Sequence, residues 1–276
     1  MLILQSGEGF PKPCALLMGG FDGLHLGHGA LVEAAKGTKL PVGIMTLLGL
    51  KGGSLFTRQE RELIFDRAGI DFVLELNFEK IKEILAEDFL KGILPVTAVF
   101  CGEDFRFGKD ALGTPELIKR FADVTVQKTV CTGGEKISAS RCKSLLANGD
   151  MVALNALLMH PYFLQGVVEH GRQTGRTYGF PTLNLTVPSS KLAPKEGVYG
   201  GYVETPKGEY PAIIHLGARP TFGLIESKLE AHLVGFSGDL YGATVRVYPT
   251  KFLRPVTRFS SVEELKKQLE KDIKEV

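Results

Sequence analysis

Two histidines follow a short apolar run near the start of the chain. The run spans residues 14–18 and suits a buried strand, and GGFDGLHLGH at 19–28 follows it directly. Residues 30–36 are expected to be helical, which places His25 and His28 at a helix N-terminus. Unpaired N–H groups and the helix dipole favour anions there, each charge interaction being worth roughly 0.3–1 kcal/mol. The spacing therefore predicts a phosphate site, to which the imidazoles add donors.

The same stretch has other interpretations. A glycine-rich turn after a strand is common and is weak evidence by itself. Two histidines three residues apart could bind a metal, but no third His, Cys or carboxylate stands nearby at zinc-ligand spacing. The stretch has neither the G-K-[ST] of a P-loop nor the G-x-G-x-x-G turn of dinucleotide-binding proteins. We therefore favour phosphate over metal.

The composition is typical of a globular enzyme. The 276 residues have a net charge of +2 and are 44% hydrophobic, which argues against nucleic acid or an acidic membrane as a main partner. No apolar run reaches the roughly 18 residues of a spanning helix, and the first residues lack a basic segment, so we expect a cytoplasmic protein. The four cysteines are scattered, as in reduced proteins: Cys14, Cys101, Cys131 and Cys142.

Short apolar runs alternate with amphipathic stretches through the first half of the chain. Thr57 and Glu60 form a capping box, and Thr114-Pro115 is a cap followed by proline at the first helical position. This alternation predicts an α/β fold, a Rossmann-like doubly wound parallel sheet with ligands beyond the carboxyl ends of its strands. Strands are expected at 42–48, 72–76, 96–101 and 124–130, and helices at 57–68 and 78–94.

Two further loops carry polar groups at expected strand or helix ends, GEDFRFG at 102–108 and ISASRCK at 137–143. Each alone fits an ordinary turn or N-cap. Together with the first motif they resemble the adenylyltransferase half of bacterial bifunctional riboflavin kinase/FAD synthetases, which are HxGH nucleotidyltransferases. The resemblance covers about residues 14–147 and implies that His25 and His28 hold ATP phosphates. It also implies phosphate or ATP contacts for Gly19, Phe21, Asp22, Gly23, Gly27, Asp104, Ser138, Ser140, Arg141 and Lys143.

Three departures from the family pattern concern this half. Ala139 and Ser140 replace the second Ser and the Thr of I-S-S-T, and Cys142-Lys143 replaces the closing I-R. A lysine provides a point charge where an arginine would grip phosphate with two parallel hydrogen bonds. Residues 47–51 also lack the F-x-P-H-P segment of the family. These departures leave open an enzyme with kinase activity only.

The pattern changes near residue 159, and we expect domains at 1–158 and 159–276. Short β-rich runs at 198–204, 212–216, 229–236 and 244–248 predict a small antiparallel β-barrel. The chain then ends in an amphipathic stretch at 261–274, with a capping box at Ser261 and Glu264. That helix is expected to pack onto the barrel.

The second half contains a Thr and an Asn two residues apart in an extended stretch. Thr182 and Asn184 should point to one side and offer neutral oxygens, which suit Mg²⁺. Residues 166–184 resemble the riboflavin kinase pattern G-x-V-x-x-G-x-x-x-G-R-x-x-G-F-P-T-x-N. By that resemblance Thr182 and Asn184 hold the metal, and ATP is contacted by Gly171, Gly175 and Arg176.

A glutamate follows farther along, in the apolar run at 229–236. An acid within an apolar strand is costly unless a partner or a function compensates. Glu230 and the DLYG segment at 239–242 resemble the riboflavin kinase segments in which this glutamate accepts the proton of the ribityl hydroxyl. Arg254 and Phe259 extend the resemblance and are expected near the flavin, whereas His215 replaces an Asn of the family.

The resemblance implies a bifunctional transferase. Riboflavin kinase activity would convert riboflavin and ATP to FMN in the barrel, and FMN adenylyltransferase activity would convert FMN and a second ATP to FAD in the first domain, with Mg²⁺ accompanying ATP. The alternatives are a riboflavin kinase with a degenerate first domain and a non-catalytic flavin-binding regulatory protein. We expect ATP, riboflavin and FMN as partners, no nucleic acid or membrane, and a monomer or weak homo-oligomer.

Overall fold

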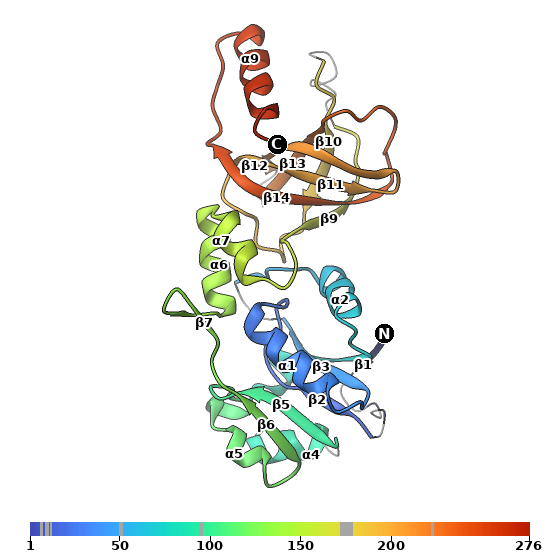
Figure 1. The fold of residues 1–276 in the computed structure, drawn as a ribbon, viewed down its shortest axis with the longest axis vertical. Coiled ribbons are helices and arrows are strands. Elements are labelled where there is room, and N and C mark those ends of the chain that lie inside the picture. Colours follow the sequence, from blue (N-terminus) through green and yellow to red (C-terminus); the bar gives the residue numbers. More distant parts are fainter. Residues whose placement is uncertain are drawn as a thin grey trace. The chain divides into compact units, whose positions relative to one another are not determined.

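The chain folds into two compact units in the computed structural model (Figure 1). The first comprises Met1–Ser54 and Arg61–Ala139, and the second comprises Leu55–Glu60 and Ser140–Val276. The structure describes residues 1–276 except 6–7, 9–10, 12, 50–51, 94–95, 172–178 and 222–223. Among the described residues, no helix has both the length and the apolar character needed to cross a membrane.

A six-stranded parallel sheet forms the centre of the first unit, as predicted. Its strand order is β1-β4-β3-β2-β5-β6, so the chain leaves β2 toward β3 on one side and later returns to β5 on the other. Such a switch point is where open α/β sheets bind ligands. The strands are β1 (Leu2–Gln5), β2 (Ala15–Leu17), β3 (Val42–Leu48), β4 (Phe72–Asn77), β5 (Ala98–Gly102) and β6 (Asp123–Gln127).

The prediction of one helix at 78–94 is wrong, because the structure has two helices there. Asn77 caps the first one, accepting a hydrogen bond from the Glu79 N–H. Between the two helices the Ile84 carbonyl accepts a hydrogen bond of 2.7 Å from the Lys109 backbone N–H. The helical elements are α1 (Leu26–Lys36), α2 (Arg58–Arg67), α3 (Phe78–Ile81), α4 (Ala86–Ile93), η1 (Lys109–Ala111) and α5 (Pro115–Ile118).

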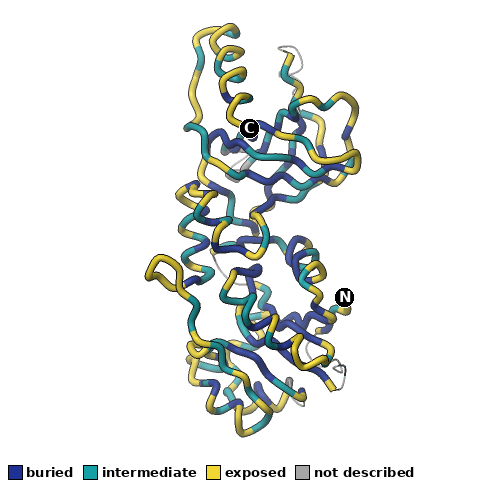
Figure 2. The backbone as a smooth tube through the Cα atoms, in the orientation of Figure 1, coloured by how far each residue is buried: buried dark blue, intermediate teal, exposed yellow. Residues whose placement is uncertain are grey.

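The four central strands of the first unit, β2 to β5, consist mostly of buried residues, whereas the edge strands β1 and β6 are more exposed (Figure 2). All three residues of β2 are fully buried, as are Ile44 and Phe72 of the neighbouring strands. Gly43 lies directly against the Phe72 ring, where a methyl group would come within 2.1 Å of it. A rigid, dry sheet of this kind gives fixed positions to the loops that follow its strands.

The second unit is a six-stranded antiparallel sheet that closes into a near-barrel, as predicted. Its order is β10-β13-β12-β11-β14-β9, and the edges are joined where the Glu169 N–H donates to the Asn184 carbonyl at 2.9 Å. The strands are β9 (Leu164–Val167), β10 (Leu183–Val187), β11 (Gly197–Thr205), β12 (Gly208–Thr221), β13 (Leu224–Leu233) and β14 (Thr244–Arg254). Helices α6 (Ala139–Asn148) and α7 (Met151–Leu157) precede them.

The C-terminal helix α9 (Val262–Ile273) packs on this sheet, which confirms the prediction. Ser261 caps it by accepting from the Glu264 N–H at 3.2 Å. Near its other end the buried carboxylate of Asp272 pairs with Arg254 at the end of β14, with the closest nitrogen and oxygen 2.8 Å apart. The Arg254 Nε also lies 3.2 and 3.1 Å from the two carboxylate oxygens. The pair fastens the helix to the sheet.

Two candidate active sites

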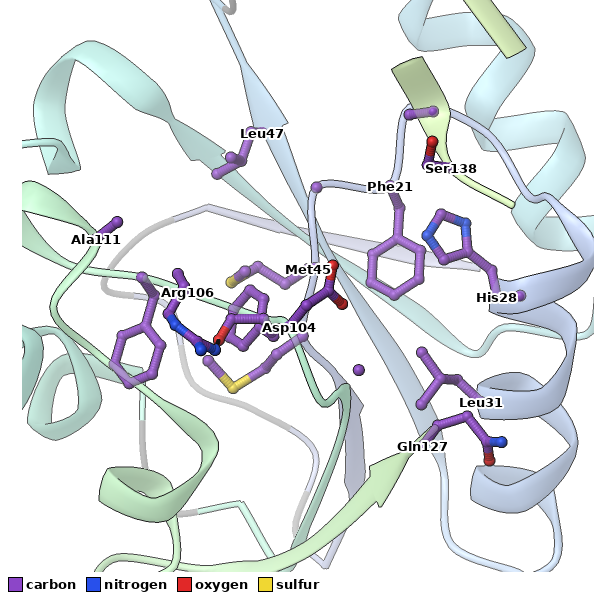
Figure 3. Close-up of a pocket in the computed structure, with 18 of the residues that line it drawn as sticks. Phe21, His28, Leu31, Met45, Leu47, Asp104, Arg106, Ala111, Gln127 and Ser138 are labelled. Atoms are coloured by element: carbon purple, nitrogen blue, oxygen red, sulfur yellow. Dashed lines mark hydrogen bonds between the residues drawn. The ribbon is translucent and has the colours of Figure 1, made fainter. Parts of the chain in front are cut away.

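A pocket of about 810 Å³ lies within the first unit, beyond the carboxyl ends of its strands (Figure 3). Met18 follows β2, and Leu47, Gly102 and Gln127 lie at the ends of β3, β5 and β6. All three polar loops identified in the sequence contribute residues to it. From these loops the lining includes Gly19, Phe21, Gly27, His25, His28, Asp104, Arg106, Ser138 and Ala139.

The two histidines stand where α1 begins. His25 is the N-cap, and its Nδ1 accepts from the His28 backbone N–H at 3.3 Å. The Nδ1 of His28 lies 3.1 Å from the carbonyl oxygen of Gly23. The two rings are stacked with their centroids 3.6 Å apart, and Phe21 packs against His28 at 4.4 Å. Both side chains are therefore fixed before any ligand binds.

Burial makes both imidazoles neutral at physiological pH. It is the main cause that lowers the pKa of His25 to about 4, with the charge of Lys136 lowering it further while a backbone hydrogen bond and Asp104 oppose. Burial, followed by the charge of His25, also holds the pKa of His28 well below its ordinary value. Before an anion binds, the two histidines are thus oriented dipoles rather than positive charges.

Asp22 and Gly23 of the first motif do not line this pocket. The Asp22 carboxylate is buried, and an oxygen of it lies 3.9 Å from the Arg61 guanidinium. Gly23 has φ of 132°, a conformation that favours glycine, and its carbonyl meets His28. These observations give both residues a place in shaping the turn, and their contact with phosphate stays a prediction.

Asp104 of the second loop lines the pocket and pairs with Lys136, the last residue of the small hairpin of β7 (Cys131–Thr132) and β8 (Glu135–Lys136). The hydrogen bond from Lys136 is the main cause that lowers the pKa of Asp104. Lys136 was not foreseen from the sequence, although it directly precedes the third loop. Arg106 donates at 2.8 Å to the Phe105 carbonyl.

The third loop enters the pocket through its first residues. Ile137 is fixed by a 3.0 Å bond from its N–H to the Val130 carbonyl, and Ser138 and Ala139 line the cavity. Ser140, Arg141 and Lys143 continue the chain on α6 and belong to the second compact unit. Their contact with ATP stays a prediction.

One wall of the pocket is apolar and was not anticipated. Figure 3 shows Leu31, Met45 and Leu47 around the cavity. Phe78 and Phe89 come from the two helices that replace the predicted single helix. A cavity with polar loops on one side and such a wall on another suits a molecule with both a charged and a flat apolar part.

In the second unit, strand register brings the predicted kinase residues together. Asn184 of β10 pairs with Glu230 of β13, and Glu230 pairs with His215 of β12. The neighbouring Leu229 and Ala231 face the core and are fully buried, whereas Glu230 is partly exposed. The expected cost of burying the Glu230 carboxylate therefore does not arise, because alternation along β13 places it on the opposite face from the core.

Asn184 lies on that same face, directly opposite Glu230, and Thr182 is two residues before it, just ahead of β10. The Asn184 side-chain nitrogen donates to the Thr182 carbonyl at 3.5 Å, and Gly171 approaches so closely that a methyl group on it would lie 2.4 Å from this nitrogen. Gly175 and Arg176 fall outside the described residues. The hydroxyl, amide and carboxylate oxygens of Thr182, Asn184 and Glu230 are donors of the kind that a hard cation such as Mg²⁺ prefers. Among the residues that the structure describes, no cluster of three or more His, Cys, Asp or Glu side chains is present.

Arg254 and Phe259 lie together at the edge of the second unit. The guanidinium carbon of Arg254 is 5.6 Å from the centroid of the Phe259 ring. Since Arg254 also pairs with Asp272, part of its role is structural. Contact of these two residues with flavin stays a prediction.

Comparisons with known proteins match both halves of the chain. A family model for FAD synthetase matches residues 8–141, and one for riboflavin kinase matches residues 158–276. The bifunctional riboflavin kinase/FMN adenylyltransferase of Escherichia coli K12 is 34% identical, over 94% of this chain and 90% of that protein. The Bacillus subtilis protein of the same name is 30% identical, also over 94% of this chain and 90% of that protein.

A solved structure has the same fold as this chain. The crystal structure of a protein described as a macrolide-efflux protein from Streptococcus pneumoniae superposes with a TM-score of 0.90. It is 28% identical, and the match covers 99% of this chain and 98% of that one. With both family models present and curated relatives similar over nearly their whole length, the chain belongs to the bifunctional riboflavin kinase/FMN adenylyltransferase family.

Proposed function

We propose that this chain phosphorylates riboflavin to FMN and then adenylylates FMN to FAD, using ATP in both reactions. The observation that carries the proposal is that separate halves match the two family models and that each half contains its own cluster of the matching residues. We assign the adenylyltransferase to residues 1–158 and the kinase to residues 159–276.

In the kinase half, the chemistry is transfer of the γ-phosphoryl group of ATP to the ribityl hydroxyl. Glu230 takes the hydroxyl proton as the oxygen attacks the γ-phosphorus and ADP leaves with the electrons of the broken bond. Such general-base assistance is commonly worth about 10²–10⁴-fold. Mg²⁺ bound through Thr182 and Asn184 would offset the phosphate charge. Gly171 keeps Asn184 in place by close backbone approach. Most of the catalysis then comes from positioning and electrostatics.

In the adenylyltransferase half, a phosphate oxygen of FMN attacks the α-phosphorus of ATP and pyrophosphate leaves with the electrons of the broken bond. No side chain needs to act as nucleophile. His25, His28 and Ser138 stabilise the charge on the phosphates. Removal of one such donor commonly lowers the turnover rate by about 10²–10³-fold. The apolar wall beside Met45 suits the flavin ring.

The proposal also includes the partners of the enzyme, its location and its oligomeric state. ATP, riboflavin and FMN are its partners, Mg²⁺ accompanies ATP, and the net charge of +2 gives no reason to invoke nucleic acid or a membrane surface. We place it in the cytoplasm as a monomer or weak homo-oligomer.

The test is incubation of the whole chain with riboflavin and Mg-ATP, followed by chromatography of the flavins. The proposal expects FMN and FAD. The departures at Ala139 and Lys143 favour a second candidate, riboflavin kinase alone, for which only FMN would form. Absence of both products would instead support a flavin-binding regulatory protein.

A further inference from the structure

The two imidazoles of the first pocket differ in which ring nitrogen carries hydrogen. The Nδ1 of His25 lies 3.3 Å from the backbone nitrogen of His28, whose N–H can only donate. That Nδ1 therefore holds a lone pair. In a neutral ring the hydrogen is then on Nε2, so His25 already offers an N–H to an arriving phosphate.

His28 has the opposite arrangement. Its Nδ1 lies 3.1 Å from the Gly23 carbonyl oxygen, which can only accept, so Nδ1 carries the hydrogen. The Nε2 of the neutral ring is then a lone pair. His28 lines the pocket, and with this tautomer it meets an anion as a second acceptor rather than as a donor.

The groups around the two rings keep His28 neutral until an anion arrives. His25 is stacked on it, Phe21 packs against it, and both burial and the proximity of His25 hold its pKa well below the ordinary value. The charges that face His25 are Lys136 and Asp104, which pair with each other. Among the residues that the structure describes, the charges acting on the two rings thus include no unpaired carboxylate that would protonate His28 beforehand.

We propose that binding of a phosphate group in this pocket is coupled to the uptake of one proton from solvent at Nε2 of His28. A phosphate oxygen and a bare Nε2 would face each other with lone pairs, whereas the protonated ring donates a charge-assisted hydrogen bond. The proton comes from water or buffer, forms the new N–H bond, and returns when the anion leaves. The proposal deepens the adenylyltransferase half of the proposed function and rests on it.

The coupling has a defined sign. Because the complex holds one more proton than the separated partners, phosphate affinity falls as pH rises, by up to about tenfold per pH unit. His25 contributes no such dependence, since its Nε2 hydrogen is already present. Of the two histidines, only His28 therefore takes up a proton when phosphate binds.

Calorimetric titration with inorganic pyrophosphate tests the proton count. The whole chain is titrated at one pH in two buffers of different ionisation enthalpy, which gives the protons taken up per ligand. His28→Gln supplies a neutral amide donor in place of the ring, and His25→Asn keeps an oxygen that can cap α1. Protonation of pyrophosphate itself is common to all three proteins and cancels between them.

We expect wild type to take up about one proton more than His28→Gln. His25→Asn should bind more weakly than wild type but keep the wild-type proton uptake. Equal uptake by wild type and His28→Gln, or loss of uptake in His25→Asn alone, would overturn the assignment. So would failure of wild type to bind pyrophosphate.

Nitrogen NMR of ¹⁵N-histidine-labelled protein reads the tautomers directly. Without ligand, His28 should show hydrogen on Nδ1 only and His25 on Nε2 only, and pyrophosphate should add hydrogen to Nε2 of His28. Hydrogen on Nε2 of His28 before ligand addition would refute the inference. If proton uptake occurs but the wild type makes no FAD from FMN, the phosphate site stands and the adenylyltransferase proposal fails.

Discussion

The two candidate sites are built in different ways from one chain. In the first unit the polar residues follow the ends of parallel strands, and three loops converge on one pocket. In the second, Asn184 and Glu230 lie on neighbouring antiparallel strands and meet through their register. A residue of such a loop can change without altering the pairing of the strands beneath it. A site on strand faces depends on every strand keeping its pairing.

Their electrostatics differ as well. The first site presents two imidazoles whose pKa values are lowered by burial, so its residues bind and stabilise charge. The second presents a partly exposed carboxylate beside neutral oxygen donors. Loss of one residue should therefore weaken charge stabilisation in the first site and proton transfer in the second.

The largest expected effect comes from the double substitution at the first site, which should abolish one activity and spare the other. Replacing both His25 and His28 by Ala should reduce FAD formation from FMN by about 10³-fold or more, because two oriented donors are lost. Riboflavin phosphorylation should remain. Leu26→Ala, an exposed residue between them that does not line the pocket, is the matched control. Loss of both activities in the double variant would contradict separate sites.

Glu230→Gln should reduce riboflavin phosphorylation by about 10²-fold or more, because the amide keeps the size but cannot take the hydroxyl proton. Riboflavin affinity and FAD formation from FMN should change little. Steady-state kinetics with each substrate separately measures this, together with equilibrium riboflavin binding. Near-normal phosphorylation would remove Glu230 from the catalytic role.

Gly171→Ala tests the close approach at the second site. Its methyl group would lie 2.4 Å from the Asn184 side-chain nitrogen, so Asn184 must move. We expect phosphorylation to fall by about tenfold to hundredfold, with a higher Mg²⁺ requirement. Gly166→Ala is the control, since its methyl group would meet Leu185 at an ordinary 3.4 Å. Equal effects of the two substitutions would show general damage to the barrel.

The smallest effect concerns Lys143, which lies on α6 after the third loop. If the lysine is a weaker phosphate ligand than the arginine of the family pattern, Lys143→Arg should raise FAD formation from FMN by roughly a few-fold. Riboflavin phosphorylation serves as the internal reference in the same sample. An unchanged or lower rate would mean that the local surroundings already compensate.

Local signals in the sequence predicted much of the fold. The strand at 42–48 coincides with β3, and the Thr57–Glu60 capping box is present, with the Glu60 N–H 3.2 Å from the Thr57 hydroxyl. The short strand β1 was missed, because four residues at an edge carry little pattern and pair with β4 far along the chain. Between α3 and α4 the Ile84 carbonyl accepts a bond from the Lys109 backbone, a contact that no local pattern reveals.

Local sequence patterns were also insufficient for some details of the sites. Motifs identified the loops around the first pocket, but the tautomers of His25 and His28 depend on two distances across the folded turn. Lys136 could have been noticed as a cation directly before the third loop. The face occupied by Glu230 was present in the alternation of residues 229–233, and treating the run as uniformly apolar obscured it.

Mixing two variants tests the central claim, that one chain holds two separate chemistries. With riboflavin and Mg-ATP, the His25/His28 double variant alone should stop at FMN, and Glu230→Gln alone should form little of either product. An equimolar mixture should make FAD, because FMN released by one variant reaches the intact site of the other. FMN accumulation without FAD in the mixture, while Glu230→Gln still converts added FMN, would contradict transfer between independent sites. Failure of Glu230→Gln to convert added FMN would contradict the separation itself.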